Sequence, residues 1–183
     1  IIKNGQCYID GELKEVDVAI QDGKIYKIGQ ISEEAKETIN AEGQTVLPGC
    51  IDTQTHFREP GSTDTEDLHS GSRAAIAGGI TSVFEMPNTN PPTSTKVEFQ
   101  KKLDLARNRM YCNYAFYFGA TADNANELAD LVNLEGCCGI KLFAGSSTGN
   151  LLVAEEEDIE KVFQSSSKVV AVHSEDEAIL NIN

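Results

Sequence analysis

The first 46 residues alternate apolar and polar side chains over short stretches, as half-buried antiparallel strands do. The segments Val16–Ile20 and Lys24–Ile28 both follow this alternation. The dipeptides Asp10-Gly11 and Asp22-Gly23 fall between such stretches, and Asp-Gly is typical of tight hairpin turns. Residues 1–46 are therefore predicted to form a small β lobe.

From Leu47 onward, short apolar runs alternate with longer segments that have helical spacing. The runs predicted to be strands are Cys50–Asp52, Thr81–Met86, Asn113–Gly119, Gly139–Phe143 and Val169–His173. The segments predicted to be helices are Asp67–Ala77, Thr95–Asn108, Asn124–Leu134 and Glu155–Ser165. Strands separated by one helix each indicate parallel βα units, and nearly continuous apolar strands indicate a sheet covered on both faces. We therefore expect an α/β fold.

Parallel βα units form either an open, doubly wound sheet or a (β/α)8 barrel. An open sheet is expected to carry a glycine-rich phosphate loop after its first strand. Here the first strand instead leads into the polar segment Asp52–Gly61. Polar and charged side chains also recur at the ends of the later strands, where a barrel places its chemistry. We predict part of a (β/α)8 barrel in residues 47–183, preceded by the β lobe of residues 1–46.

Composition and charge narrow the classes of partner. The 183 residues are 40% hydrophobic and carry a formal net charge of −14. Because no basic stripe is present, we expect binding neither to nucleic acid nor to anionic membranes. No apolar run approaches the roughly 18 residues of a membrane span. The five cysteines lack Cys-x-x-Cys spacing, which is typical of structural thiols in a reducing compartment and predicts a cytoplasmic protein.

Two of the three histidines, His56 and His173, stand at the ends of predicted strands, whereas His69 lies in a polar helical segment and is expected to be solvated. Lys141 interrupts an apolar strand, where burial favours the neutral amine. A neutral amine can react with CO2 to give a carbamate, which can bridge two metal ions about 3.5–4 Å apart. The combination predicts a Zn2+ site. The alternatives are structural histidines and a lysine that reaches solvent or pairs with a carboxylate.

Arg58 and Asn88 follow the first and second predicted strands of the barrel. The planar guanidinium of arginine matches a carboxylate, and an asparagine amide offers both a donor and an acceptor. Together they could hold a small substrate that carries a carboxylate and an amide. The alternative is that Arg58 pairs with Glu59 or Asp52, and that Asn88 caps its proline-rich turn.

Several motifs resemble those of the amidohydrolase superfamily, and specifically those of the dihydroorotases. They occur in the family's order over nearly the whole chain. The segments are Leu47–Asp52, His56–Gly61, Gly78–Thr81, Met86–Thr89, Gly139–Phe143 and His173–Glu177. The His-Phe-Arg-Glu-Pro-Gly and Met-Pro-Asn-Thr pieces together are specific to dihydroorotases and close cyclic-amide relatives.

This resemblance implies a metal-dependent (β/α)8 barrel that interconverts dihydroorotate and N-carbamoyl aspartate in pyrimidine biosynthesis. It implies that His56, Lys141 and His173 are metal ligands for one or two Zn2+ ions, with Lys141 carbamylated and with His56 and Lys141 as the catalytic residues. It also implies that Arg58 and Asn88 hold the substrate's carboxylate. The lobe of residues 1–46 is then one half of a composite β-sandwich. We further expect a homo-oligomer, with a transcarbamoylase as an additional partner.

Gln54 departs from the family pattern, which has His-x-His where this chain has Gln54-Thr55-His56. A glutamine oxygen is a weaker ligand for Zn2+ than an imidazole. The departure leaves open a single-metal enzyme or a non-catalytic, dihydroorotase-like scaffold. A hydantoinase or allantoinase is the other alternative, since these enzymes share the barrel and the lysine.

The count of strands bears on completeness. Five barrel strands are predicted, whereas a (β/α)8 barrel has eight. No histidine follows His173, and the strand-eight Asp that the family uses as general base has no counterpart here. We therefore expect these residues to be part of a protein about twice as long, and the 183-residue piece alone to be inactive.

Overall fold

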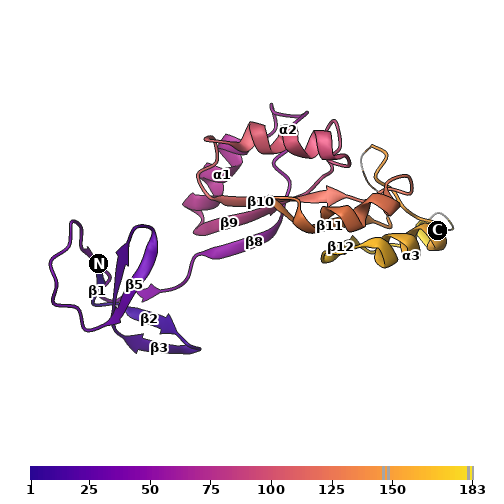
Figure 1. Cartoon of the computed structure of the whole chain (residues 1–183). Helices are drawn as coiled ribbons and strands as arrows, with labels where there is room; N and C mark the ends of the chain where they lie inside the picture. Colours follow the sequence, from indigo (N-terminus) through magenta and orange to yellow (C-terminus); the bar gives the residue numbers. More distant parts are fainter. Residues whose placement is uncertain (146, 148, 181, 183) are drawn as a thin grey trace. The chain divides into compact units, whose positions relative to one another are not determined.

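The computed structural model describes residues 1–145, 147, 149–180 and 182 (Figure 1). The chain divides into two compact units, Ile1–Gly49 and Cys50–Asn183. The sequence placed this division between residues 46 and 47, close to the division in the structure. Each unit is described separately below.

The first unit consists of two small β-sheets. Its strands are β1 (Ile2–Lys3), β2 (Gln6–Ile9), β3 (Glu12–Glu15), β4 (Asp17–Gln21), β5 (Lys24–Gly29), β6 (Ile39–Asn40) and β7 (Thr45–Val46). One sheet has the order β5-β4-β1-β6 and the other the order β3-β2-β7. Asp10 and Asp22 have φ values of 52° and 51° at the two hairpin turns, a left-handed conformation that Asp tolerates and the following glycine favours. The two predicted hairpins are confirmed.

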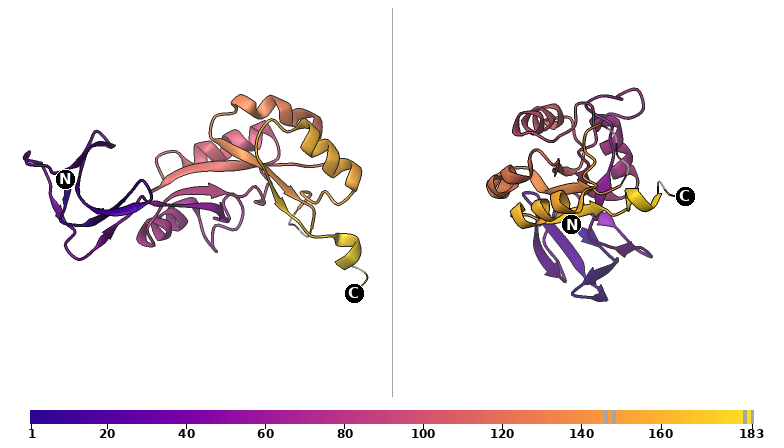
Figure 2. Two further views of the ribbon diagram at one scale, coloured as in Figure 1. Left: turned by 90° about the horizontal axis from the view of Figure 1, so that it is seen from below. Right: turned by 90° about the vertical axis from the view of Figure 1, so that its right-hand side faces the viewer.

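The second unit is a single parallel sheet with the order β12-β11-β10-β9-β8. Its strands are β8 (Cys50–Thr55), β9 (Ile80–Glu85), β10 (Asn113–Gly119), β11 (Cys137–Phe143) and β12 (Val170–His173). The helices are α1 (Leu68–Ala77), α2 (Lys96–Ala106), the 3-10 helix η1 (Ala125–Asn133), α3 (Glu156–Ser165) and α4 (Glu177–Leu180). Figure 2 shows that the sheet curls into part of a barrel. This confirms the predicted α/β fold, a partial barrel preceded by a small β lobe.

The main core of the second unit lies between the sheet and its helices. Phe116 and Phe118 of β10 and Ile140 and Leu142 of β11 are fully buried there, together with Phe99 of α2. Because alternate residues of a strand point to opposite faces, this packing turns Lys141 toward the concave side of the sheet. Core packing thus fixes the direction of a candidate catalytic side chain.

The segment after β10 differs from the α-helix that its spacing suggested, because it forms the 3-10 helix η1. Its buried residues, Ala125, Leu128 and Leu131, recur every three positions. That interval matches the three residues per turn of a 3-10 helix, whereas an α-helix needs intervals of three and four. The sequence also places apolar residues at 129 and 132, which is compatible with an α-helix, so the three-residue interval is a feature of the burial pattern in the structure.

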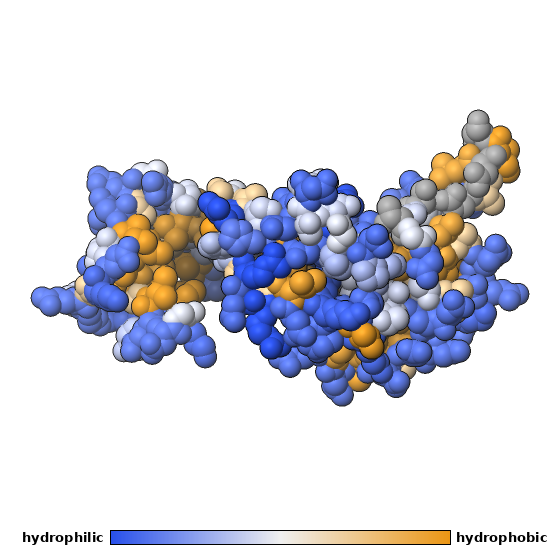
Figure 3. Space-filling model, turned by 90° about the horizontal axis from the view of Figure 1, so that it is seen from above, coloured by the Kyte–Doolittle hydropathy of each residue, from blue (hydrophilic) through white to orange (hydrophobic). Residues whose placement is uncertain are grey.

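Exposed apolar side chains gather on the first unit, where orange surface is visible in Figure 3. Ile20, Ile25, Tyr26 and Ile28 of strands β4 and β5 are among them. In the part of the chain that the structure describes, no helix combines the length and apolar character needed to cross a membrane.

Candidate active site

The carboxyl ends of the parallel strands surround a cavity of about 470 Å3. Its lining comprises Gln54, His56, Arg58, Asn88, Lys141, Phe143, Ser147 and His173. All six residues singled out in the sequence as ligands or substrate contacts therefore line one cavity, although they come from four different strands or strand ends. His69 is not among the lining residues; its ring packs edge-on against Tyr111, with 5.2 Å between ring centroids.

The imidazole of His56 is held by Asn88. His56 Nδ1 lies 2.9 Å from Asn88 Oδ1. Since an amide oxygen only accepts hydrogen bonds, Nδ1 carries the proton and the lone pair of the neutral ring resides on Nε2. Partial burial is the largest cause of the lowered pKa of His56. The hydrogen bond to Asn88 raises this pKa, whereas the positive charges of Arg58 and Lys141 lower it further. A neutral imidazole with a free Nε2 is the form that binds metals.

Lys141 lies deep in the cavity and is only 3% exposed. Its Nζ sits 4.9 Å from the centroid of the Phe143 ring. Burial lowers the pKa of the Lys141 amine, because removal from water disfavours the charged form. Burial therefore shifts Lys141 toward the reactive, neutral amine relative to a lysine in water, whereas the Phe143 ring favours the ammonium.

His173 is the last residue of strand β12. This strand lies at one edge of the sheet, and β8, which precedes His56, lies at the other edge. The Nε2 atom of His173 lies 3.0 Å from Glu175 Oε2, and its ring stacks on Phe143 at 6.1 Å between centroids. A Cβ added to Gly145 would meet the Glu175 side chain at 2.4 Å. The glycine thus leaves room for the carboxylate that contacts His173. Glu175 belongs to the His173–Glu177 motif, but its contact with the imidazole was not predicted.

Arg58 has a left-handed backbone conformation, with φ of 57°. The sequence left open whether it pairs with its neighbour Glu59. In the structure, Glu59 instead accepts hydrogen bonds from Arg109 Nη1 at 2.8 Å and Nη2 at 3.1 Å, and from the backbone N–H of Leu68 at 2.9 Å. The Glu59 carboxylate is thereby tied to α1 and to the segment after α2, while Arg58 lines the cavity.

The structure also bears on the two remaining alternatives, a pairing of Arg58 with Asp52 and a capping of its own turn by Asn88. Asp52, the second carboxylate considered for Arg58, accepts a hydrogen bond from the backbone N–H of Gln54 at 2.9 Å. The side-chain oxygen of Asn88 is directed to His56 rather than to its own turn. That turn is instead fixed by Thr89, whose Oγ1 donates to the carbonyl of Pro91 at 2.9 Å.

A second cavity of about 390 Å3 shares Arg58 and Asn88 with the first. Its remaining lining is polar or made of proline and glycine: Pro60, Ser62, Thr89, Asn90, Pro92 and Gly149. Residues 145–149 form a glycine- and serine-rich segment after β11. Ser147 and Gly149 line the two cavities, whereas Ser146 and Thr148 lie outside the described residues. Arg58 and Asn88 stand at the junction of the cavities.

The donors for a metal ion are two histidines and a lysine. Within the described residues, no three or more His, Cys, Asp or Glu side chains are grouped so as to hold a metal. His56 offers its free Nε2, and the Nε2 of His173 already contacts Glu175. A metal in this cavity therefore fits only if Lys141 supplies an anionic donor, and its low exposure and lowered pKa suit conversion to a carbamate.

The cysteines stand apart from this chemistry. All five are free thiols, and none lines either cavity. Burial raises the pKa of Cys112 and Cys137, and raises that of Cys138 to about 12. Thiols with raised pKa values are poor nucleophiles and poor metal ligands at neutral pH. This supports the structural role expected from the sequence for these three.

Comparison with known proteins identifies the family. The model of the amidohydrolase family matches residues 45–174, which include every residue of the cavity lining. The chain belongs to this family. Among curated members it is 38% identical over 181 residues to a dihydroorotase of Methanosarcina mazei, covering 96% of this chain and 39% of that protein. It is 39% identical over 147 residues to an allantoinase of Salmonella choleraesuis, covering 80% of this chain and 32% of that protein.

The comparison with solved structures adds a similarity to another kind of enzyme. L-hydantoinase (dihydropyrimidinase) from Arthrobacter aurescens matches 99% of this chain and 42% of its own chain, with a TM-score of 0.90 and 29% identity. The chain thus spans less than half the length of the amidohydrolases to which it is compared. Dihydroorotases, allantoinases and hydantoinases are all similar to it, so the family is established and the individual reaction is a matter for proposal.

Proposed function

We propose that this chain forms the amino-terminal part of a metal-dependent dihydroorotase, which reversibly hydrolyses dihydroorotate to N-carbamoyl aspartate. The observation that carries this proposal is the placement of Arg58 in the cavity of His56 and Lys141 while Glu59 is bound to Arg109. Dihydroorotate differs from hydantoin and allantoin in carrying a carboxylate on its ring. Within the described residues Arg58 forms no ion pair, whereas Glu59 pairs with Arg109. A guanidinium in this position suits the ring carboxylate.

The two cavities suggest how the substrate lies. Arg58 and Asn88 at their junction hold the ring's carboxylate, and the amide bond to be cleaved points toward His56 and Lys141. Because Asn88 Oδ1 accepts from His56, its Nδ2 group remains directed elsewhere and can donate to the substrate. Holding the ring at two points lowers the entropic cost of reaching the transition state.

His56, carbamylated Lys141 and His173 are the proposed ligands of Zn2+, with Gln54 as a weak additional oxygen donor. A bound Zn2+ would polarise the ring carbonyl and activate water. Overall, water adds to the ring carbonyl carbon, the ring C–N bond breaks, and the departing nitrogen takes up a proton. His56 is held for this task by Asn88, and Lys141 becomes anionic when its neutral amine adds to CO2 and releases one proton.

Turnover of four substrates tests the proposal on the complete protein. Dihydroorotate, dihydrouracil, hydantoin and allantoin all contain a cyclic amide, but only dihydroorotate carries the carboxylate. We expect the highest kcat/KM for dihydroorotate. Higher kcat/KM for hydantoin or allantoin would favour the second candidate, which is supported by the similarity to the Arthrobacter hydantoinase and the Salmonella allantoinase.

A non-catalytic scaffold is the candidate from a different class, and Gln54 is the feature that favours it. The cavity nevertheless retains Arg58, Asn88, Lys141 and His173 together, and a scaffold has no need of that combination. Metal analysis separates the two. Purification without chelator is expected to yield protein with one or two Zn2+ per chain, and protein without metal that turns over no cyclic amide would support the scaffold.

The remaining proposals concern the rest of the protein. We propose that residues 1–46 are one half of a composite β-sandwich, whose other half covers the exposed apolar side chains of β4 and β5. Residues 47–183 are proposed to supply the first five βα units of a complete barrel, and to be inactive alone. We also propose a cytoplasmic homo-oligomer in pyrimidine biosynthesis, with a transcarbamoylase as a further partner.

A further inference from the structure

A buried ion pair lies behind the candidate active site, on the helix-covered side of the sheet. Lys102 of α2 pairs with Glu85 at the end of β9, and their side chains are 0% and 1% exposed. Lys102 Nζ also donates to the backbone carbonyl of Met86 at 2.9 Å, and it lies 5.2 Å from the centroid of the Phe116 ring. No feature of the proposed reaction uses this pair.

Stability alone does not explain such a pair. Removing two charges from water is costly, and a buried ion pair can often be replaced by apolar side chains of similar size without loss of stability. Burial raises the pKa of Glu85 to about 7 and lowers that of Lys102, and the charge of each partner opposes the shift of the other. What an apolar replacement cannot supply is a donor for the Met86 carbonyl.

Met86 connects this pair to the cavity. Its carbonyl accepts from Lys102, while its backbone N–H donates to the carbonyl of Thr55 at 2.9 Å. Thr55 directly precedes His56, and two residues after Met86 comes Asn88, whose Oδ1 lies 2.9 Å from His56 Nδ1. The peptide groups on both sides of Met86 are therefore fixed. The N–H group is held by Thr55 of β8, and the carbonyl group is held by the buried ammonium of Lys102.

We propose that Lys102 is a positioning residue of the active site, which holds the Met86 carbonyl so that Asn88 keeps the His56 imidazole with its proton on Nδ1. The inference rests on the proposed function for its catalytic consequence. Glu85 acts through Lys102 by keeping the ammonium within reach of Met86. Lys102 itself touches no substrate.

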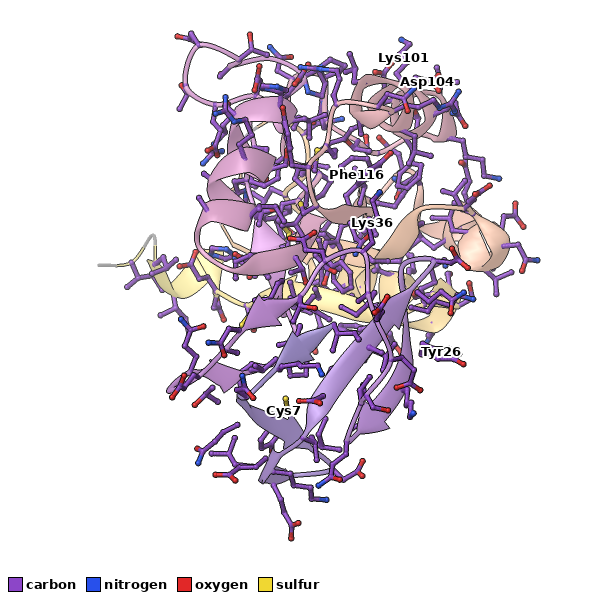
Figure 4. All side chains as sticks on the ribbon, turned by 90° about the vertical axis from the view of Figure 1, so that its left-hand side faces the viewer. Cys7, Tyr26, Lys36, Lys101, Asp104 and Phe116 are labelled. Atoms are coloured by element: carbon purple, nitrogen blue, oxygen red, sulfur yellow. The ribbon has the colours of Figure 1, made fainter. Side chains whose placement is uncertain are left out.

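The neighbouring lysine provides a matched control. Lys101 also belongs to α2, but its side chain is 63% exposed and pairs with Glu98 on the surface. Figure 4 shows Lys101 and Asp104 on the outer side of the helix, away from Phe116 in the core. Lys101→Met therefore removes the same charge from the same helix without touching Met86.

The test compares Lys102→Met, the double variant Glu85→Met/Lys102→Met, and Lys101→Met in the complete protein. The double variant removes the donor while avoiding an unpaired buried carboxylate, so it is expected to fold. Nitrogen-15 NMR of His56 in metal-free protein reports which ring nitrogen carries the proton. Steady-state kinetics report kcat and KM for dihydroorotate, and competition with a chelator reports zinc affinity.

We expect the double variant to lose the Nδ1-protonated preference of His56 and to bind zinc about tenfold or more weakly, the usual loss when a group that orients a metal ligand is removed. We expect kcat/KM to fall by at least a similar factor, with Lys101→Met unchanged. Wild-type tautomer, zinc affinity and kcat/KM in a folded double variant would overturn the proposal. So would a double variant that does not fold, because the pair would then serve stability.

Failure of the proposed function gives a different result. A wild-type protein that turns over none of the cyclic amides would refute that function, yet the His56 tautomer would still differ between the Lys102 and Lys101 variants if Lys102 positions the ring. Identical His56 spectra in all variants would overturn the positioning role whatever the substrate.

Discussion

Substitution of Arg58 by lysine tests the proposed substrate contact most directly. The change preserves the positive charge but replaces a planar fork of donors by a single ammonium. Arg58 lines both cavities, and its neighbour Glu59 is engaged with Arg109 at 2.8 and 3.1 Å. The guanidinium is therefore expected to form two parallel hydrogen bonds to the substrate's carboxylate, of which lysine retains one.

The expected magnitude follows from the hydrogen bond that is lost. A hydrogen bond to a charged group contributes about 1.5–3 kcal/mol, and each decade of affinity corresponds to about 1.4 kcal/mol. Arg58→Lys should therefore weaken binding of dihydroorotate and N-carbamoyl aspartate by about one to two decades. Since Arg58 is not among the proposed metal ligands, the zinc content should stay at the wild-type value.

The assay measures KM for dihydroorotate, Kd for N-carbamoyl aspartate, and kcat/KM for dihydrouracil, which has the same ring without the carboxylate. Only the first two are expected to change. Arg73→Lys is the matched control, because Arg73 lies over the Tyr111 ring at 6.0 Å and lines neither cavity. Unchanged affinity for both carboxylated ligands, or equal losses with dihydrouracil, would refute the assignment of Arg58.

Three further predictions concern single groups. Lys141→Ala should lose both zinc and activity, and short carboxylates should partly restore them; carbon-13 NMR that shows an ordinary ammonium at Lys141 in zinc-loaded protein would contradict the carbamate. Arg109→Met should lower the free energy of unfolding, measured in urea, by about 1.5 kcal/mol. This is the low end for a hydrogen bond to a charged group, because Arg109 is partly solvated. Arg107→Met, a change on the exposed surface, should have little effect. Burial raises the pKa of Glu85 to about 7, so the folded state holds its proton more tightly than the unfolded state, and stability from this group is lost as pH rises from about 4.5 to 7. Urea titrations of Glu85→Gln should lack this loss, and an unchanged pH profile would contradict it.

The periodicity of the sequence was sufficient for most of the fold. The strand Asn113–Gly119 has the predicted bounds, because an apolar run between two turn segments leaves few other positions at which the strand can begin or end. Helix α1 begins one residue after its predicted start, since Asp67 acts as the N-cap and accepts from the backbone N–H of Ser70 at 2.6 Å. Such ends depend on local hydrogen bonds that residue type already indicates.

Side-chain partners were less accessible to prediction. Nothing in the sequence specifies that Asn88 bonds His56, or that Glu59 selects Arg109, fifty positions away, over adjacent Arg58. These choices depend on rotamers and on the path of α2. Glu85 is different, because it stands inside the predicted strand Thr81–Met86, as Lys141 stands inside β11. The burial argument applied to Lys141 holds equally for Glu85 and would have indicated a buried partner.

The double engagement of Asn88 has a consequence for how substrate preference in this site can change. The Asn88 amide lines the cavity where the substrate's carboxylate is proposed to bind, and it also orients the imidazole of His56. A substitution that adapts position 88 to a new ring substituent therefore disturbs His56 at the same time. Within the described residues, Arg58 has no comparable contact with a proposed metal ligand, so an evolving or engineered variant can exchange it with less loss of turnover. New specificities should accordingly arise first at position 58, with Asn88 retained until a substitute for its bond to the imidazole is in place.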